Sequence, residues 1–440
     1  MGKKKKRRRV SLGTLFMLAL TALVLAGCVF LFSMLVGDGL YEKTGALIRT
    51  LTAQGLFEEM PEPQASDAPY TPAFLFAAED TPAPSAVPVP TATPIPQAST
   101  IHIAAAGTIY APKAVRESVL EGGRFDFGPV FEGLGDTLSS ADLAIATLET
   151  TAAGKDKGFG NYNTAPEILD ALRACGVDLL SLATERALDK GYDGLDLTIS
   201  ELTARGLAYA GVNPEGTGSR ATMLRVDGVQ VAVLAYTYGL SRDGEEKTRD
   251  DRLGVVSMIK TQRMAEDIRQ ARVDGANLVI VLPHWGTKNK LDVADHLRST
   301  ARTLAQAGAD VIIGTHPNVA QETERMTVTR ADGLEYDAVV CYSLGTLLTD
   351  ARTQENTAGM IAHITVTHDP VTRHTTLGEM YCTPVYIARE RVDDGAAYRV
   401  VDAESESALS LLSEAERERA REAVEVIRHI TQTEGQEGQG

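Results

Sequence analysis

Two histidines and one glutamate stand at positions that favour metal chemistry. His284 begins a His-Trp-Gly segment, His316 lies in a Gly-Thr-His-Pro-Asn segment, and Glu149 lies in a Leu-Glu-Thr segment. Carboxylate and imidazole groups are common ligands of divalent transition metals. Three such ligands and one water molecule form an open site of the catalytic type. If these three side chains converge, they can hold one ion, and they are the candidate catalytic residues.

The elements around these residues follow a repeated helix, glycine, strand order. Four predicted helices close on Gly176, Gly206, Gly275 and Gly308, and glycine suits the left-handed cap that ends a helix. Apolar runs then predict buried strands at 177–182, 207–210, 277–282 and 310–313. Further strands are predicted at 101–106, 143–148, 229–236, 338–342 and 360–367. This alternation predicts an α/β fold.

Polar side chains follow many of these strands directly. Ligands of open α/β sheets gather at the carboxyl ends of the strands, so this is where a site is expected. We predict that one cleft brings together Glu149, Arg186, His284, His316 and Asn318. Thr108 and Thr346 also follow or end apolar runs, and we count both as binding residues of the same site.

Several segments occur in an order that is typical of one family. They are Ala-Pro-Glu-Ile-Leu-Asp-Ala-Leu at 165–172, Leu-Asp-Lys-Gly at 188–191, Ala-Gly-Ala-Asp at 307–310 and Tyr-Ser-Leu-Gly at 342–345. Over roughly residues 100–385 the chain resembles the bacterial capsule synthesis protein CapA family, the poly-γ-glutamate biosynthesis group. The resemblance implies a calcineurin-like metallophosphatase fold, a four-layer α/β/β/α sandwich. It also implies a role in making, exporting or retaining an anionic envelope polymer.

The chain departs from that family's pattern at several metal-ligand positions. Thr108 stands where the family has Asp, Thr-Glu-Arg at 184–186 replaces Asn-Asn-His, Thr315 and Asn318 replace two histidines, and Thr346 replaces Asn. The resemblance implies a two-metal hydrolase centre, which needs carboxylate and imidazole ligands for both ions. Thr108 offers no anionic oxygen and Arg186 adds positive charge, so we predict a degenerate centre. We expect no cofactor, with a single ion of Mn, Fe or Zn held by Glu149, His284 and His316 as the alternative.

Each candidate also has a purely structural interpretation. His284 and His316 can be strand-end histidines with satisfied hydrogen bonds. Glu149 can cap a helix, or can pair with Arg186 so that a guanidinium replaces the metal charge. The one tryptophan, Trp285, is expected to pack at the edge of a sheet.

The N-terminus carries a membrane signal. Residues 3–9 are seven consecutive cations, and residues 10–36 contain no charge. Such a run is long enough to span a bilayer as a helix, and the basic flank predicts a cytoplasmic N-terminus. We therefore expect a single-pass signal-anchor in the cell membrane, with the remainder extracytoplasmic. The alternative is a lipoprotein processed at Cys28, because Leu-Ala-Gly-Cys at 25–28 resembles a lipobox.

Composition divides the chain into five parts. Residues 61–96 hold ten of the eighteen prolines, which favours an extended tether. Ser413 opens a predicted charged helix, which we expect to be peripheral and solvated. The predicted parts are a basic tail at 1–9, the transmembrane anchor at 10–36, a juxtamembrane segment with Pro-rich linker at 37–99, the CapA-like domain at 100–390, and a C-terminal extension with a disordered tail at 391–440.

Charge restricts the partners. Of the 43 basic residues, 36 remain when the seven N-terminal cations are left out, and the chain has 59 acidic residues. The net charge outside the membrane is therefore −23. Nucleic acid is therefore excluded as a partner. We expect proteins of envelope-polymer synthesis or export as partners, with the anionic polymer itself as the alternative. The favoured function is a non-catalytic binding or scaffold component. Two alternatives stay open: a single-metal hydrolase of phosphoester or amide linkages, and an extracellular interaction domain that kept only the fold.

Overall fold

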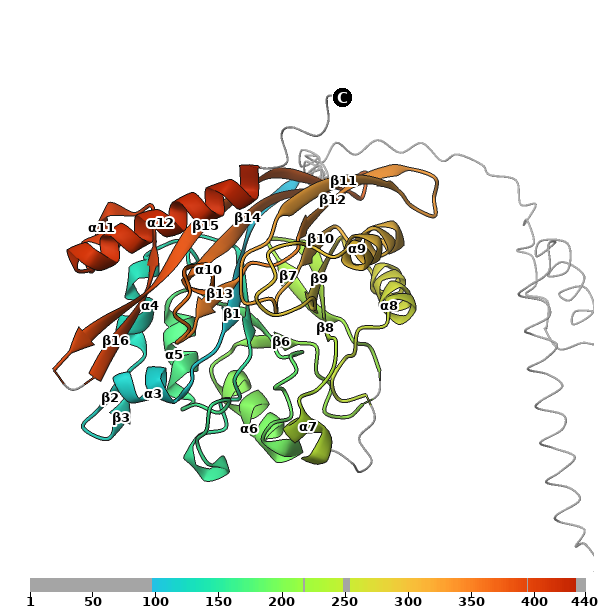
Figure 1. Ribbon diagram of the computed structural model, residues 1–440. Coiled ribbons are helices and arrows are strands. Elements are labelled where there is room, and N and C mark those ends of the chain that lie inside the picture. The colour runs from blue at the N-terminus through green and yellow to red at the C-terminus, as the bar shows by residue number, and fades with distance from the viewer. Residues whose placement is uncertain (1–96, 217, 248–253, 394, 433–440) are drawn as a thin grey trace, which may run out of the picture. The chain divides into compact units, whose positions relative to one another are not determined.

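The computed structural model describes residues 97–216, 218–247, 254–393 and 395–432 (Figure 1). These residues belong to one unit, Thr91–Gly440. The predicted membrane anchor, Cys28, most of the Pro-rich linker and the predicted disordered tail lie outside the described residues. Among the helices of the described part, none is both long enough and apolar enough to cross a bilayer.

The first sheet of the described part has eight strands in the spatial order β16-β15-β14-β1-β4-β5-β6, with β13 also paired to β1. The strands β1, β4, β5 and β6 are parallel to one another. The pairs β1–β14, β14–β15 and β15–β16 are antiparallel. The strands are β1 (Ser99–Ile109), β4 (Leu143–Leu148), β5 (Leu179–Ser181), β6 (Ala208–Ala210), β13 (Thr346–Leu348), β14 (Ala358–Asp369), β15 (His374–Val392) and β16 (Gly395–Asp402).

The second sheet has six strands in the described residues, in the order β11-β12-β10-β9-β8-β7. Its four central strands are parallel and its two edge strands antiparallel. The strands are β7 (Thr222–Val226), β8 (Val229–Thr237), β9 (Leu278–His284), β10 (Val311–Ile313), β11 (Thr323–Thr329) and β12 (Glu335–Cys341). A separate hairpin pairs β2 (Leu120–Glu121) with β3 (Arg124–Phe125).

Alternation along the strands explains why both faces of each sheet are buried. In β1, Ile101 and Ile103 belong to a core shared by the two sheets, while Ala104 and Ala106 belong to the core on the opposite face. Successive side chains of a strand point to opposite faces, so an uninterrupted apolar run supplies two cores at once.

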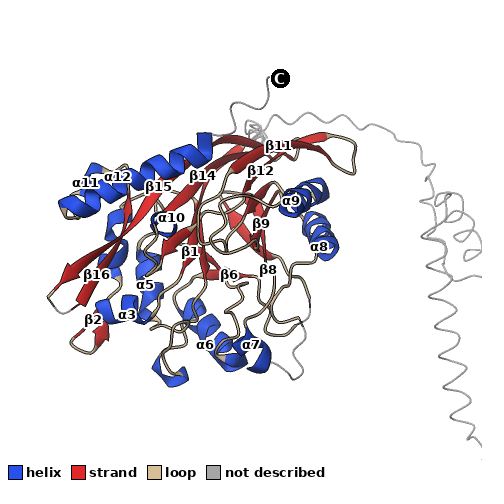
Figure 2. Ribbon diagram, in the orientation of Figure 1, coloured by secondary structure: helices blue, strands red, loops and turns tan. Residues whose placement is uncertain are grey.

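Helices cover the outer faces of the two sheets (Figure 2). The first sheet is covered by α3 (Lys113–Ser118), α4 (Gly128–Phe131), α5 (Glu167–Ala174) and α6 (Gly191–Ala204). The second is covered by α8 (Thr261–Val273) and α9 (Asp295–Ala307). The α/β class is thus confirmed, with layers in the order helix, sheet, sheet, helix. The remaining short elements are η1 (Glu132–Leu134), η2 (Lys155–Lys157), α7 (Arg242–Lys247), α10 (Gln354–Thr357) and α11 (Glu406–Leu409).

The C-terminal helix α12 (Glu414–Gln432) differs from the solvated helix expected from its charges. It lies beside β14 and β15 (Figure 1). Ala420, Ala423, Val424 and Ile427 are buried in the core that the two sheets share. These positions recur at three- and four-residue spacing, so one apolar stripe faces the sheet although the rest of the helix is charged. The prediction of a solvated helix is therefore wrong for this face.

The predicted helix ends agree with the structure. Gly176, Gly206, Gly275 and Gly308 all have positive φ, from 68° to 121°, and follow α5, α6, α8 and α9. All nine predicted strands are present. Strand β15 was not predicted, because its first half is largely exposed and lacks a continuous apolar run.

Candidate functional site

The carboxyl ends of parallel strands from both sheets carry the candidate site. Glu149 directly follows β4, and Glu185 lies four residues beyond β5. His284 is the last residue of β9, and His316 follows β10. Parallel strands bring their carboxyl ends to one edge of a sheet, which explains why residues so far apart in the chain meet.

Glu185, His284 and His316 form a buried cluster. Their side chains are 2%, 1% and 4% exposed, and one ligand-type atom from each lies within 4.8 Å of the others. Glu185 Oε2 is 2.6 Å from His284 Nε2 and 3.6 Å from His316 Nδ1. The two imidazole rings meet edge to face. Their donor atoms are of the kind that holds Zn²⁺, Mn²⁺ or Fe²⁺.

Charge and protonation are arranged consistently in this cluster. Burial lowers the pKa of His284, so its ring is neutral near pH 7. One neutral tautomer satisfies its two shorter contacts: Nε2–H donates to Glu185, and Nδ1 accepts from Thr315 Oγ1 at 2.9 Å. Burial alone would raise the pKa of Glu185, but hydrogen bonds with His284 and His316 outweigh it and lower the pKa. Glu185 is therefore an anion.

Two cations face the same carboxylate. Lys288 Nζ is 3.0 Å from Glu185 Oε1 and 3.7 Å from Glu149 Oε1. Burial would lower the pKa of Lys288, but the charges of Glu149 and Glu185 outweigh it and raise the pKa. Arg186 Nε lies 3.8 Å from Glu185 Oε1, and its guanidinium also pairs with Asp189 at 3.4 Å. Lys288 thus places between two carboxylates the kind of charge that a metal ion would supply.

Glu149 is buried and incompletely satisfied. It is 3% exposed, and among the described residues its Oε2 has no hydrogen-bond partner. Burial, and secondly the charge of Glu185, raise the pKa of Glu149 to about 8 although Lys288 opposes the shift. A carboxyl that is buried with one unpaired oxygen is an expected place for a ligand or water contact.

A cavity of about 240 Å³ opens beside this carboxyl. The buried Asn318 Oδ1 also lacks a hydrogen-bond partner among the described atoms. Asn318 has a positive φ of 60° and His316 one of 98°, an uncommon conformation for residues other than glycine. Lining residues that bear on binding are Glu149, Tyr162, Lys288, Asn318, Thr346 and Asp350. Two unpaired polar atoms on strained or buried positions make this cavity the best candidate for a small polar ligand.

The structure brings most of the predicted site residues together. Arg186, His284 and His316 contact Glu185. Glu149 is linked to this group by Lys288, whose ammonium contacts both glutamates. Thr346 lines the cavity, but its hydroxyl already donates to Asn356 O at 2.6 Å. Thr108 is fully buried at the end of β1, and its Oγ1 has no hydrogen-bond partner in the described part of the chain. Binding by these residues stays a prediction.

Some contacts differ from those expected from the sequence. Glu149 pairs with Lys288, whereas the ion pairs of Arg186 among the described residues are with Glu185 and Asp189. Trp285 directly follows β9, is 1% exposed and stacks near Tyr342 in the core of the second sheet, which agrees with the packing role expected for it.

Two residues of the candidate site were not predicted. Glu185 stands in the segment 184–186, where the family pattern has a histidine ligand and this chain has Arg186. Its place just after a buried strand was the signal that could have identified it. Lys288 lies in the loop after β9, four residues beyond His284, and nothing in the local pattern distinguishes it from an ordinary surface lysine.

The chain is similar in sequence to known proteins. Among curated proteins, the chain is 28% identical over 194 residues to the PGA biosynthesis protein CapA of Bacillus subtilis, covering 43% of this chain and 47% of that one. It is 26% identical over 259 residues to the capsule biosynthesis protein CapA of Bacillus anthracis, covering 56% and 58%. The chain therefore spans about half the length of the curated relatives it matches.

A solved structure and a family model complete the comparison. The calcineurin-like phosphoesterase YfkN of Bacillus subtilis is 13% identical, with a TM-score of 0.37 over 75% of this chain and 100% of that one. The model of the family described as bacterial capsule synthesis protein PGA_cap matches residues 102–351, which is more than half of the chain. The matched range includes Glu149, Glu185, His284, Lys288 and His316. Because the match covers more than half of its length, the chain belongs to the bacterial capsule synthesis protein PGA_cap family.

Proposed function

We propose that this protein is a membrane-anchored, extracytoplasmic component of capsule or envelope-polymer biosynthesis, and that its degenerate metal centre binds an anionic ligand rather than hydrolysing it. Family membership supports the broad role, and the matched relatives are named for capsule and PGA biosynthesis. The polymer is an anionic chain of the poly-γ-glutamate kind, which the protein helps to make, export or retain. Its partners are the membrane and the proteins of the polymer machinery.

One observation carries the binding role: Lys288 occupies the space between Glu149 and Glu185. Two dications cannot share this space with an ammonium group and the nearby Arg186 without strong repulsion. The centre therefore does not fit the two-ion arrangement. Lys288 and Arg186 instead offer fixed positive charge to a carboxylate or phosphate, and Arg186 can do so through paired hydrogen bonds.

The same geometry fits one metal ion, and this favours a second candidate function. Glu185, His284 and His316 would hold the ion; His284 would then be the neutral tautomer with its proton on Nδ1, where Thr315 Oγ1 would accept it, so that Nε2 could ligate. A bound ion would supply Lewis acidity and lower the pKa of a water molecule. Around it, Lys288 would hold the Glu185 carboxylate in place and keep Glu149 within reach of a ligand. The second candidate is accordingly a single-metal hydrolase of phosphoester or amide linkages.

Complementation of a deletion strain separates the two functions. Surface polymer is measured in cells that carry the wild-type gene, Lys288→Met or His284→Gln. The binding function predicts that Lys288→Met loses polymer, and that purified wild-type protein hydrolyses neither a phosphomonoester nor a γ-glutamyl amide with or without added Mn²⁺. Metal-dependent hydrolysis that His284→Gln abolishes would instead establish the second candidate. Unchanged polymer in the deletion strain itself would contradict a role in the polymer pathway.

A further inference from the structure

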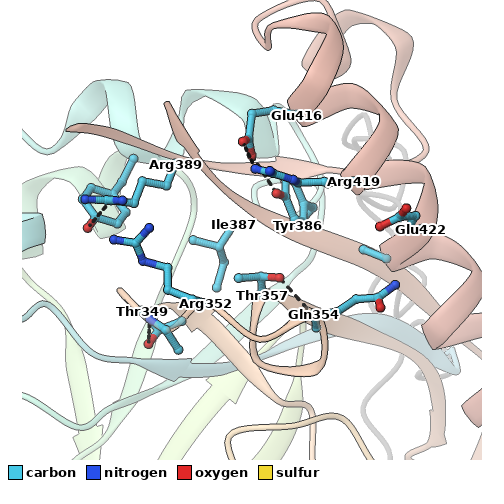
Figure 3. A pocket seen from close by; sticks show the side chains of 13 residues that line it. Thr349, Arg352, Gln354, Thr357, Tyr386, Ile387, Arg389, Glu416, Arg419 and Glu422 are labelled. Atoms are coloured by element: carbon cyan, nitrogen blue, oxygen red, sulfur yellow. Dashed lines mark hydrogen bonds and ion pairs between the residues drawn. The ribbon is translucent and has the colours of Figure 1, made fainter. Parts of the chain in front are cut away.

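A second pocket is lined mostly by residues beyond those that match the family. It is formed by the segment 349–357, the strands β15 and β16 and the helix α12, and it has a volume of about 290 Å³ (Figure 3). We call it the arginine pocket, after its lining residues Arg352, Arg389 and Arg419. Thr349 and Ala351 line both this pocket and the candidate-site cavity, so the two spaces are neighbours.

One of the three arginines is neutralised locally. Arg419 Nη1 lies 2.5 Å from Glu416 Oε1, and the other oxygen of Glu416 accepts a hydrogen bond from Tyr386 at 2.6 Å. Glu416 is only 5% exposed, so this carboxylate is held by two partners inside the protein. The Arg419–Glu416–Tyr386 group is therefore closed and needs no external ligand.

The other two arginines lack such a partner. Arg352 Nε donates to Asp350 O at 3.2 Å, and Arg389 Nε donates to the Tyr398 hydroxyl at 3.0 Å. Within the described residues, neither guanidinium lies within 4.0 Å of a carboxylate. Both therefore keep positive charge and terminal N–H donors that no described carboxylate neutralises, in a protein with a net charge of −16.

Figure 3 shows how this charge is distributed. The side chains of Arg352 and Arg389 lie toward the same side of the pocket, whereas Gln354 and Glu422 lie on the other side, with Ile387 between. Two guanidinium groups on one side of a pocket repel each other, and an anion placed between them offsets that repulsion. Guanidinium forks also match the two oxygens of a carboxylate in geometry.

We infer that the arginine pocket is a binding site for a carboxylate group, which Arg352 and Arg389 hold from two sides. Tyr398 fixes the orientation of the Arg389 guanidinium through the Nε–H bond, which leaves the terminal nitrogens for the ligand. Glu422 at the opposite end disfavours a second negative charge and favours an N–H donor such as an amide or ammonium group. The ligand class is thus a carboxylate compound of amino-acid type.

The ligand can be a free small molecule or one unit of a longer polymer. The shared lining by Thr349 and Ala351 favours the polymer, because one extended chain can reach from the candidate-site cavity into the arginine pocket. The choice of a γ-glutamyl polymer as the ligand rests on the proposed function. The inference that Arg352 and Arg389 bind a carboxylate does not rest on it. Residues 352–423 of the pocket also lie outside the matched residues 102–351, so family membership does not imply this site.

Titration calorimetry on the full-length protein in detergent micelles tests the inference. The probes are free L-glutamate, a γ-glutamyl decamer and inorganic phosphate at low salt. Arg352→Gln and Arg389→Gln should each weaken binding of the carboxylate probes at least 10-fold. Arg391→Gln is the matched control, because Arg391 lies on the same strand but does not line the pocket, and it should change affinity less than 2-fold.

The results distinguish a polymer ligand, a free small-molecule ligand and the absence of a carboxylate site. Tighter binding of the decamer than of glutamate, lost in both pocket variants, supports the polymer as ligand. Binding of glutamate alone supports the site with a free small molecule as ligand and contradicts the polymer. No carboxylate binding by wild type, equal binding by the pocket variants, or a preference for phosphate overturns the inference. The proposed function is tested separately, by the polymer phenotype of the deletion strain and of Lys288→Met. Failure of the arginine-pocket inference therefore does not imply failure of the proposed function, or the reverse.

Discussion

The ammonium group of Lys288 lies 3.0 Å from the carboxylate of Glu185, whose other oxygen contacts His284. One carboxylate thereby joins a cation on one side and a pair of imidazoles on the other. Positive charge from a side chain thus stands beside three groups that could hold a metal ion.

Replacing Lys288 by methionine should destabilise the fold. The buried Glu185 anion would lose its nearest cation while Glu149 stays beside it, and removing one partner of a fully buried pair costs about 3–5 kcal/mol. Lys288 is partly exposed, so we expect a smaller loss, roughly 2 kcal/mol in the free energy of unfolding. Urea denaturation of the full-length protein measures it. Lys290→Met, on the exposed part of the same loop, should leave stability unchanged to within about 0.5 kcal/mol.

Arg186→Ala and His316→Ala should weaken binding of the γ-glutamyl decamer without unfolding the protein. A charge-assisted hydrogen bond contributes about 1.5–3 kcal/mol, which corresponds to roughly a 10-fold or larger loss of affinity. Thr346→Ala should do less, because its hydroxyl is already engaged with Asn356 O. Arg242→Ala, whose side chain is 88% exposed, serves as the charge control. Equal affinities for all four variants and the wild type would remove the candidate cleft from the binding model.

How far the sequence predicts this site depends on the kind of signal. His284, His316 and Glu149 follow continuous apolar strands, and that pattern places them at the carboxyl edge regardless of side-chain detail. Lys288 could not be found this way, because its role comes from a loop conformation that brings its ammonium between two carboxylates. The buried face of α12 was not predicted because charges dominate the helix's composition and two of the four residues in its buried stripe are alanines, which are only weakly apolar.

Stability should depend on the protonation of His363. Burial and the neighbouring His102 lower the pKa of His363 from 6.5 to about 4, and its ring stacks between His102 and Tyr381. In the unfolded chain His363 takes up a proton near pH 6.5, whereas the folded protein resists it until about pH 4. The resulting stability is therefore complete above pH 6.5 and is lost as the pH falls toward 4, by up to about 3 kcal/mol.

His363→Gln should flatten this dependence. Thermal unfolding midpoints between pH 7 and pH 4.5 should fall less steeply in the variant than in the wild type. The exposed His296→Gln is the matched control and should keep the wild-type slope. Identical slopes for all three proteins would show that another group governs the acid sensitivity.

The orientation of the chain in the membrane is open to a direct test. If the basic N-terminus is cytoplasmic, protease added to cells freed of their wall should cut within residues 61–96 and release a soluble fragment. A cytoplasmic marker protein must stay intact in the same cells. A domain that protease reaches only after the cells are permeabilised would refute the orientation. Mass spectrometry of the N-terminus decides between an intact anchor and a lipidated Cys28.

Metal content tests the central claim most directly. Full-length protein is purified without chelators, and Mn, Fe and Zn are measured per chain by elemental analysis, with Glu185→Gln as the comparison. Because Lys288 and Arg186 supply positive charge beside Glu185, the account predicts fewer than one equivalent in total, and any bound ion should be lost in Glu185→Gln. Two tightly held ions per chain, retained in the wild type after dialysis, would contradict it.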